Sequence, residues 1–257
     1  GNLTLSMGGG ADTFLSSKFK NGDSVDMGAG DDIVYMMIGG GSGTPALASL
    51  DMTKLDGGAG TDTLYFTEST AGGTEINLTS GGAVNFENIG GTTAADTIRG
   101  NTGNNVIYGN SGSDTIYGGA GDDILVGNDR YNDGADDATV NAEDNLYGQA
   151  GDDSLYGTAA DNILDGGTGA DTVYSGDGSD TIVLRAGDGG STLAAADTIT
   201  DFTDGSDVFG MHSSMGYDDL TIAQGSGSNS SDTIISIGAE YLAILTGVTS
   251  STINYLD

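Results

Sequence analysis

A nine-residue repeat runs through most of this chain and limits what it can fold into. Aspartate or asparagine followed by x-apolar-x recurs in steps of nine at Asp96, Asn105, Asp114 and Asp123, and again at Asp144, Asp153, Asn162, Asp171 and Asp180. Well-formed copies read GGAGDDILV from Gly118 and GGTGADTVY from Gly166. A fixed short period predicts a repeat architecture, in which small units stack and bury a shared core.

The same frame extends toward the N-terminus with gaps. It fits the acidic residues Asp12, Asp23, Asp32, Asp62 and Glu87. Three segments, about 36–52, 67–85 and 127–143, interrupt the repeat. We expect loops in the first and third. The second contains EINL and AVNFENI, which predict longer strands.

The residue types predict a turn followed by a short strand in each repeat. Glycine adopts positive φ without strain and lets backbone carbonyls crowd an ion. Aspartate supplies the hard oxygen ligands that Ca²⁺ prefers, six to eight of them with carbonyls included. The apolar residue of each strand should point inward and form a core ladder of Ile98, Ile107, Ile116, Leu125, Leu146, Leu155, Leu164, Val173 and Ile182.

The charge balance excludes several classes of partner. The chain has 38 acidic residues against 6 Lys and Arg, a formal charge of -32. Nucleic acid needs clustered basic residues, so it is not an expected partner, and anionic membrane surfaces are disfavoured for the same reason. No apolar run of about 18 residues predicts a membrane span. The chain has no cysteine, so disulfides are excluded.

The repeat G-G-x-G-x-D-x-U-x resembles the calcium-binding nonapeptide of the RTX (repeats-in-toxin) family, most densely over residues 92–184. This resemblance implies an all-β fold, a right-handed parallel β-roll (a β-helix solenoid) with calcium-binding glycine-rich turns and a C-terminal β cap. Two nonapeptides would make one turn of the roll. Several Ca²⁺ ions would lie between successive turns on the same side, with ligands eighteen residues apart.

The resemblance also implies the ligands, residue by residue. Side-chain ligands would be Asp12, Asp23, Asp32, Asp62, Asp96, Asn105, Asp114, Asp123, Asp144, Asp153, Asn162, Asp171, Asp180, Asp197 and Asp201. Backbone carbonyl ligands would be Gly109, Ser111, Gly118, Ala120, Gly148, Ala150, Gly166 and Thr168. Asparagine replaces aspartate at Asn105 and Asn162, and Ala160 replaces glycine, so weaker sites are predicted there.

We expect folding and calcium binding to be coupled. Nine ordered residues per inward side chain lose more conformational entropy than that side chain gains on burial. Bound ions must make up the difference. Extracellular calcium modules bind in the range of about 0.1–1 mM, so the chain should be disordered in the cytosol and fold outside the cell or on a bacterial cell surface.

The segment ADTITDFTDGSDVF, from Ala196, resembles the one that ends the β-roll of serralysin-type proteases and other type I secreted proteins. Asp197, Asp201 and Asp207 could close the last ion sites there. Apolar residues at Ile199 and Phe202 would cap the core. The alternating apolar residues beyond it predict further strands, which form a plain β cap or include an uncleaved secretion signal.

Three regions are therefore expected. Residues 1–90 would form irregular N-terminal rungs with loop insertions, 91–204 a regular roll with an insertion at 127–143, and 205–257 the cap and secretion signal. The opening GNLTLSM lacks the basic and apolar regions of a secretory signal, so residue 1 is expected to be a cut point within a longer chain.

Catalysis is not predicted. His212 is the single histidine, so neither a zinc site nor a supported Ser-His-Asp set is present. Paired carboxylates such as Asp122-Asp123 fall in repeat turns, where calcium or solvent explains them. In the insertion, Asp129, Asp133 and Asp137 have a loose EF-hand-like spacing, which indicates an extra calcium site or a solvated acidic loop.

A tyrosine follows the inward position in many repeats and should face outward. These residues are Tyr35, Tyr65, Tyr108, Tyr117, Tyr147, Tyr156 and Tyr174. They shield the sheet, or they bind a surface polysaccharide or a second copy of the chain.

Three functions follow. The first is a calcium-dependent structural or assembly segment of a type I secreted surface-layer protein or adhesin. The alternative is the C-terminal secretion and folding module of an exported hydrolase or epimerase. The third is an ice-binding β-roll, which needs a flat Thr and Asn array, and only the text at 101–105 resembles one.

Overall fold

The computed structural model describes residues 2–16, 19, 22–37, 52–67, 74–78, 82–128, 142–212, 215–251 and 253. Much of the three expected interruptions of the repeat therefore lies outside the described residues. Short 3₁₀ helices lie at Met52–Lys54 (η2), Leu193–Ala195 (η3), Tyr217–Asp219 (η4) and Gly227–Asn229 (η5). No described helix is both long enough and apolar enough to cross a membrane.

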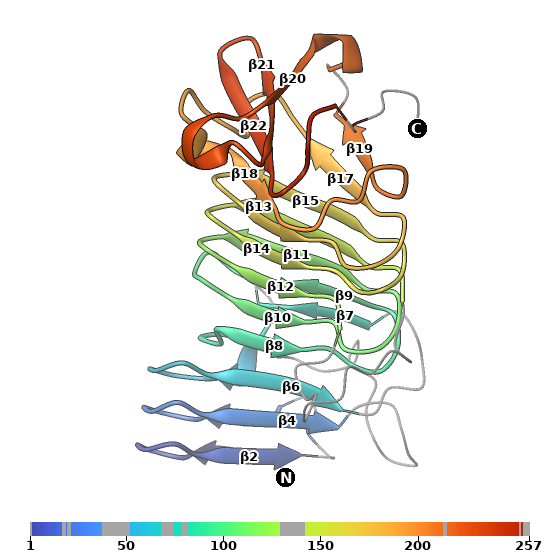
Figure 1. Ribbon diagram of the computed structural model, residues 1–257. Helices are drawn as coiled ribbons and strands as arrows, with labels where there is room; N and C mark the ends of the chain where they lie inside the picture. Colours follow the sequence, from blue (N-terminus) through green and yellow to red (C-terminus); the bar gives the residue numbers. More distant parts are fainter. Residues whose placement is uncertain are drawn as a thin grey trace.

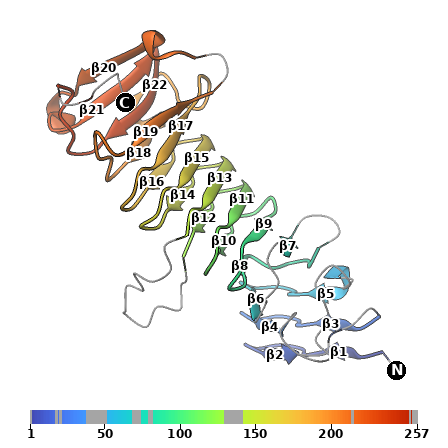
Figure 2. The same cartoon turned by 90° about the vertical axis from the view of Figure 1, so that its right-hand side faces the viewer.

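Strands stack as successive rungs, and alternate strands lie on opposite walls (Figure 1, Figure 2). One wall is a 12-stranded sheet that runs the length of the roll. In spatial order its strands are β2 Thr13–Ser16, β4 Ile33–Met37, β6 Thr63–Thr67, β8 Asn88–Gly90, β10 Val106–Tyr108, β12 Ile124–Val126, β14 Ser154–Tyr156, β16 Thr172–Tyr174, β18 Asp197–Ile199, β22 Glu240–Leu245, β21 Thr233–Ile237 and β20 Leu220–Gln224.

The opposite wall is divided into two sheets. A 3-stranded sheet consists of β1 Thr4–Ser6, β3 Ser24–Asp26 and β5 Leu55–Asp56. A 7-stranded sheet consists of β7 Thr74–Asn77, β9 Asp96–Arg99, β11 Thr115–Ala120, β13 Asn145–Ala150, β15 Ile163–Thr168, β17 Thr181–Leu184 and β19 Val208–Met211.

Pairing between rungs is parallel and keeps equivalent repeat positions opposite one another. Ile107 of β10 pairs with Leu125 of β12, eighteen residues later, as two nonapeptides per turn predict. Ile116 of β11 pairs with Leu146 of β13, thirty residues later. The extra twelve residues (30 - 18) belong to the insertion, which leaves the register of the rungs unchanged. The predicted parallel β-roll is confirmed.

The predicted core ladder is also confirmed. All nine inward residues from Ile98 to Ile182 are at most 2% exposed. Val34, Leu64 and Ile89 continue the column into the N-terminal rungs with the same burial. Because residues on a strand alternate between faces, the residue after each of them is turned outward.

The expectation of longer strands in 67–85 and just beyond is wrong. EINL contributes to β7, which has four residues, and AVNFENI reaches only into β8, which has three. Between them, Val84 makes a single bridge to Asp56, while Ala83 and Phe86 are buried in a turn. Ala83 and Phe86 fill the interior where the opposite wall changes from the 3-stranded to the 7-stranded sheet. The alternating apolar pattern therefore does not mark a strand here.

An antiparallel meander closes the C-terminal end of the roll (Figure 1, red strands). β22 joins the roll by pairing in parallel with β18. Phe202 and Phe209 stack with ring centroids 4.6 Å apart, and Ile235 and Leu245 are fully buried beneath the meander. The predicted β cap is therefore present.

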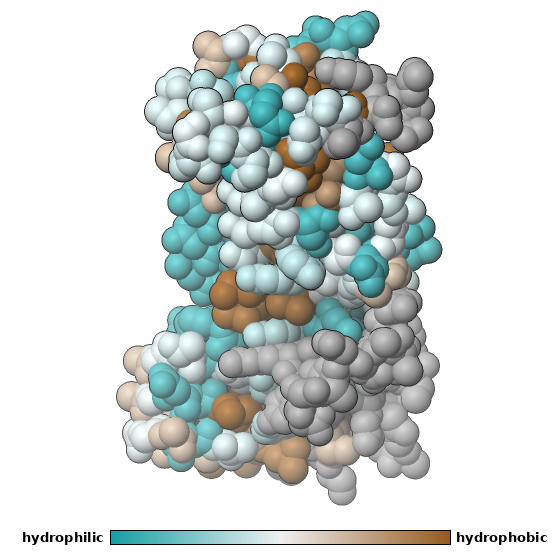
Figure 3. Space-filling model, viewed as in Figure 1, coloured by the Kyte–Doolittle hydropathy of each residue, from teal (hydrophilic) through white to brown (hydrophobic). Residues whose placement is uncertain are grey.

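The outer faces carry the predicted tyrosines, which are partly exposed. They stack between neighbouring rungs in the pairs Tyr35–Tyr65 at 5.3 Å, Tyr117–Tyr147 at 5.0 Å and Tyr156–Tyr174 at 6.5 Å. Figure 3 shows an apolar patch at mid-height over β10 and β12. The outward residues of those strands are Val106, Ile124 and Val126 together with Tyr108.

Candidate calcium sites

Acidic residues form two columns, one along each edge of the roll where the turns lie. We number each turn from its first glycine position, so that the acidic residue is the sixth. The first column precedes the strands of the 12-stranded sheet and contains Asp12, Asp32, Asp62, Glu87, Asn105, Asp123, Asp153, Asp171 and Asp197. The second precedes the 7-stranded sheet and contains Asp96, Asp114, Asp144, Asn162, Asp180 and Asp207.

In most rungs one oxygen of the carboxylate accepts a hydrogen bond from the N–H of the equivalent residue in the preceding rung. The N–H of Asp123 donates to Oδ1 of Asp153 at 2.7 Å, and the N–H of Asp153 donates to Oδ1 of Asp171 at 2.8 Å. The second column repeats the arrangement, with the N–H of Asp114 donating to Oδ1 of Asp144 at 2.8 Å. These bonds fix the position and orientation of most carboxylates along the stack.

The other oxygen of most of these carboxylates is buried without a hydrogen-bond partner. This holds for Oδ2 of Asp12, Asp32, Asp62, Asp114, Asp123, Asp144, Asp153, Asp171 and Asp180. A buried, unpaired carboxylate oxygen is strongly unfavourable unless a cation or a proton satisfies it.

In several turns the unpaired oxygen faces a backbone carbonyl across the space left by the first glycine, as at Asp62, Asp114, Asp123 and Asp153. A Cβ added at Gly118 would overlap Oδ2 of Asp123 and lie 2.9 Å from the carbonyl oxygen of Gly148. A Cβ at Gly148 would overlap Oδ2 of Asp153 and the carbonyl oxygen of Gly166 in the same way. Carboxylate and carbonyl oxygens with no donor between them are the ligand set that Ca²⁺ selects. These residues therefore fit a bound calcium ion.

Four of the carbonyl groups predicted as ligands point into the spaces beside these glycines. The carbonyl oxygens of Gly109, Gly118, Gly148 and Gly166 each point into the space beside the first glycine of the preceding rung. The carbonyls of Ala150 and Thr168 accept N–H bonds from Gly121 and Gly151, at 2.9 and 3.0 Å. Ser111 and Ala120 occupy the same third turn position in their own rungs.

Over the described chain, no three His, Cys, Asp or Glu side chains converge as metal ligands would. The carboxylates instead succeed one another along the columns, one per rung. A calcium ion here would therefore take its charge from one or two carboxylates, and its remaining ligands would be carbonyl oxygens or water.

Burial makes these carboxylates hard to ionise without a cation. Desolvation, partly opposed by the hydrogen bond from Asp96 and reinforced by Asp144, raises the pKa of Asp114 to about 8. Desolvation likewise raises the pKa of Asp123 and of Asp171 to about 7, and that of Asp197 to about 8. Without metal, the folded columns thus favour protonated acids near neutral pH.

Comparison with known proteins agrees with this geometry. The family model "RTX calcium-binding nonapeptide repeat (4 copies)" matches residues 54–67, 90–125, 139–173, 147–182 and 156–190. The chain carries RTX calcium-binding nonapeptide repeats. No curated protein matches the sequence.

Among solved structures, the extracellular lipase LipA from Serratia marcescens matches with 17% sequence identity and a TM-score of 0.33. The match covers 76% of this chain and 44% of the lipase chain, so the chain spans less than half the length of that enzyme.

The RTX turns are of two kinds, and the backbone distinguishes them. In open turns the second and fourth residues both have positive φ, and Oδ2 of the sixth residue is unpaired. Most second and fourth residues are glycine, but Asn110 and Gln149 adopt positive φ at the second position. The open turns are 7–12, 27–32, 57–62, 109–114, 118–123, 148–153, 166–171 and 175–180.

In closed turns the sixth residue accepts a hydrogen bond from within its own turn. In turn 91–96, the N–H and the hydroxyl of Thr92 both donate to Oδ2 of Asp96, at 2.7 and 2.9 Å. In turn 157–162, the hydroxyl of Thr158 donates to Oδ1 of Asn162 at 3.2 Å. The same hydroxyl groups accept the N–H of the fourth residue, which completes a local side-chain turn. Both turns share the sequence G-T-x-A-x-[DN].

Turns 100–105 and 202–207 are closed in a related way. The N–H of Asn101 donates to Oδ1 of Asn105 at 2.8 Å, and that of Thr203 donates to Oδ2 of Asp207 at 2.7 Å. The amide of Asn162 adds a donor where the open turns have an unpaired acceptor, since its Nδ2 bonds the carbonyl of Ala160. The predicted ligands Asp96, Asn105 and Asn162 are therefore already hydrogen-bonded within their turns.

The remaining predicted ligands differ in their contacts. Asp201 lies outside both columns, and its oxygens accept the N–H groups of Ser175 and Gly176 at 2.9 and 2.8 Å. Asp23 accepts the N–H of Leu3 at 2.7 Å in the N-terminal rungs. Asp197 continues the first column, since it accepts the N–H of Asp171 at 3.0 Å.

One column member, Glu87, was not among the predicted ligands, and another, Asp207, was expected only to close the last ion sites. Glu87 accepts the N–H of Asp62 at 2.7 Å, and Asp207 accepts that of Asp180 at 3.2 Å. Their spacing from neighbouring acidic residues, nine before Asp96 for Glu87, is the signal that could have identified them. The EF-hand-like residues of the insertion lie outside the described residues.

Proposed function

We propose that the chain is a calcium-dependent structural and assembly segment of a type I secreted extracellular protein, of surface-layer or adhesin type. It folds when it meets calcium outside the cell. The single observation that supports this most directly is the row of buried, unpaired carboxylate oxygens in the open turns, several of which face a carbonyl oxygen of the next rung.

The electrostatics make folding depend on an ion. The chain has a formal charge of -32, and the columns place carboxylates on adjacent rungs, at the spacing of neighbouring strands. Without cations these groups repel one another or must take up protons. A calcium ion between rungs would remove the repulsion and join consecutive turns, so binding free energy becomes folding free energy.

The ligand set also supports a location outside the cell. Open turns supply about one carboxylate per rung, and few charged ligands correspond to weak sites of about 0.1–1 mM. Such sites fill at extracellular calcium concentrations. A chain that folds only after export would pass unfolded through a secretion channel. The surface of the roll, with its stacked tyrosines, would then serve assembly, and the proposal includes no catalytic role.

The test is a calcium titration followed by far-UV circular dichroism and light scattering. We expect a coil-to-sheet transition between chelator and about 10 mM calcium, the range of extracellular sites. Ordered scattering after that transition supports the assembly role. A chain that has its full β signal in chelator at neutral pH contradicts the proposal.

A second function, the secretion and folding module of an exported hydrolase or epimerase, is favoured by the cap. The meander and the Phe202–Phe209 stack seal the C-terminal end of the core, so the roll is a closed unit at that end. A folding module of this kind needs no assembly surface. The same titration separates the two functions, because a folding module gives the transition with no increase in scattering.

A further inference from the structure

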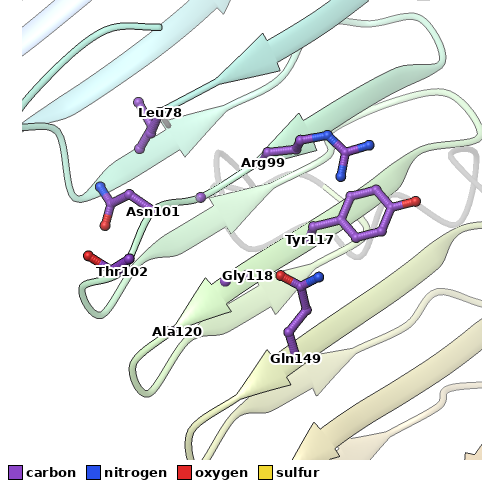
Figure 4. Close-up of a pocket in the computed structure, with 10 residues that line it drawn as sticks. Leu78, Arg99, Asn101, Thr102, Tyr117, Gly118, Ala120 and Gln149 are labelled. Carbon is purple, nitrogen blue, oxygen red and sulfur yellow. The ribbon is translucent and has the colours of Figure 1, made fainter. Parts of the chain in front are cut away.

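A groove lies where the outer face of the 7-stranded sheet runs into the turns of the first carboxylate column (Figure 4). Its volume is about 580 Å³. The floor is the backbone of Gly118, Gly119 and Ala120, where β11 runs on into its turn. Asn101 and Thr102 line one side, and Arg99, Tyr117 and Gln149 line the other.

Gln149 is strained, and its own bonds do not explain the strain. It occupies the second position of an open turn with φ of 82°, where Gly119 and Gly167 stand in the rungs before and after. Glycine adopts this conformation freely, but a side chain there costs on the order of 1 kcal/mol or more. Its exposed side chain has no hydrogen-bond partner among the described residues.

Asn110 shows what a compensated case looks like. It has φ of 72° at the same turn position, and its side chain donates to the carbonyl of Gly91 at 2.7 Å. Strain without a local bond indicates a ligand-binding role, because strained residues concentrate where binding groups must be held in place.

Other groups around the groove are also held in place yet unused. The ring of Tyr117 is fixed between the guanidinium of Arg99, 4.0 Å from its centroid, and the ring of Tyr147. Its hydroxyl and the side chain of Thr102 have no hydrogen-bond partner in the described part of the chain. A hydroxyl, an amide and a second hydroxyl thus surround a flat floor of glycine and alanine.

We infer that this groove binds a neutral polysaccharide chain. The floor of glycine and alanine carries no polar side chain, so it suits the apolar face of a sugar ring. The hydroxyl and amide groups on its rim suit sugar hydroxyls. The formal charge of -32 disfavours a polyanion, and the one cation of the groove, Arg99, is partly neutralised by Glu75 at 3.9 Å. This inference names a partner for the proposed surface role, and it rests on the proposed function for the location outside the cell.

The test is affinity electrophoresis of the full chain in native gels that contain a neutral polysaccharide and about 10 mM calcium. The probes are dextran, galactomannan, xyloglucan and a soluble β-1,3-glucan, with polygalacturonate as the charged comparison. At least one neutral polymer should retard the chain. Gln149→Gly should then weaken that binding at least tenfold while thermal stability stays the same or rises, because glycine relieves the strain.

Asn110→Gly is the matched control, since it makes the same change at the same turn position away from the groove, and it should bind as the unmodified chain does. Retardation by polygalacturonate alone, by none of the polymers, or equally for Gln149→Gly overturns the inference. Circular dichroism in the same buffers separates this from the proposed function. If calcium folds the chain but no neutral polymer binds, only the inference about the groove is overturned. If a polymer binds but the chain is already folded in chelator, only calcium-dependent folding is overturned.

Discussion

The N–H of Asp123 donates a hydrogen bond of 2.7 Å to Oδ1 of Asp153, thirty residues later in the chain and one rung further along the roll. The other oxygen of Asp153 is buried, has no partner and faces the carbonyl of Gly166. One carboxylate therefore does two things, since one oxygen orders the preceding turn and the other remains available to a cation between this rung and the next.

Asp153→Asn tests that division. The amide keeps an oxygen for the N–H of Asp123, but it removes the negative charge at the position of Oδ2. We expect the chain to lose at least one calcium ion. In calcium about 100-fold above the dissociation constant, a lost site removes about 2.7 kcal/mol from the free energy of unfolding. Calcium content by atomic emission and urea unfolding measure the two effects.

Asp152→Asn is the control for that variant. Asp152 lies in the same turn and is exposed, and its Oδ1 accepts the N–H of Ala170 at 2.9 Å, a bond that the amide oxygen keeps. It should retain the full calcium content. Equal loss from both variants would show that general acidity, and not the buried oxygen, binds the ion.

The repeat period accounts for much of what could be predicted from the sequence. A step of nine fixes both the face and the rung of each residue, so it places Ile116 inward and Tyr117 outward, where the structure also has them. The step alone does not place Asp114 and Asp144 on one edge, since thirty residues separate them, and the structure brings them together because the insertion leaves the register intact.

Weaker sites were predicted at Asn105 and Asn162, which lie in two of the closed turns, but the division into open and closed turns was not predicted, since both fit one nonapeptide frame. The difference lies in local backbone conformation and in hydroxyl groups at Thr92 and Thr158 that the frame treats as variable. The G-T-x-A-x-[DN] sequence was the available signal. The ion pair of Arg185 with the buried Asp165 was also missed, because it joins positions that are not equivalent in the repeat.

Rewriting a closed turn as an open one should create a calcium site. Thr158→Gly, Ala160→Gly and Asn162→Asp together give residues 157–162 the sequence GGAGDD, which is the sequence of the open turn 118–123. We expect the calcium content to rise by at least one ion per chain. In chelator the variant should be less stable than the unmodified chain, because the bonds of Thr158 and Asn162 are lost.

Asn162→Asp alone is the matched variant. It restores the carboxylate but keeps the hydroxyl of Thr158 and the closed backbone, so it should gain no ion. If the single variant takes up as much calcium as the triple variant, side-chain charge and not turn geometry decides which turns bind.

The stability of the chain in chelator should fall as the pH rises. Burial raises the pKa of Asp62, Asp153 and Asp180 to about 6, of Asp123 and Asp171 to about 7, and of Asp114 to about 8, from an ordinary value of 3.8. The folded chain therefore binds protons more tightly than the unfolded chain. The stabilisation is fully present below about pH 4 and is lost as the pH rises through about 6 to 8.

Circular dichroism between pH 4 and 8, with and without calcium, measures this effect. In chelator the β signal should be larger at acidic pH than at neutral pH. With calcium present the signal should be retained at neutral pH, because the ion takes the place of the protons. A chelated chain that gains structure as the pH rises would contradict the assignment of these carboxyls to the folded interior.

The inward ladder should be much more sensitive to truncation than the outward face. Leu155 is 1% exposed and pairs with Leu125 and Val173 on the neighbouring rungs. Leu155→Ala should cost about 2–5 kcal/mol in urea unfolding with calcium present. Ile124→Ala, on the outward face of the adjacent rung and 40% exposed, should cost well under half as much. Similar losses would mean that the outer face is covered in solution.

Gly118→Ala separates the space needed by the ion from the backbone freedom of glycine. Gly118 does not have positive φ, so alanine meets no conformational penalty there. Its methyl group would overlap Oδ2 of Asp123 and lie 2.9 Å from the carbonyl of Gly148, where the ion is expected.

Gly103→Ala is the control, since its nearest neighbour would be Oδ1 of Asn101 at 3.4 Å, in a closed turn. We expect Gly118→Ala to lose at least one calcium ion and Gly103→Ala to lose none, as measured by atomic emission. If alanine at 118 leaves the calcium content unchanged, the ion lies elsewhere in the turn, and the first glycine of the repeat serves packing between rungs and not ligation.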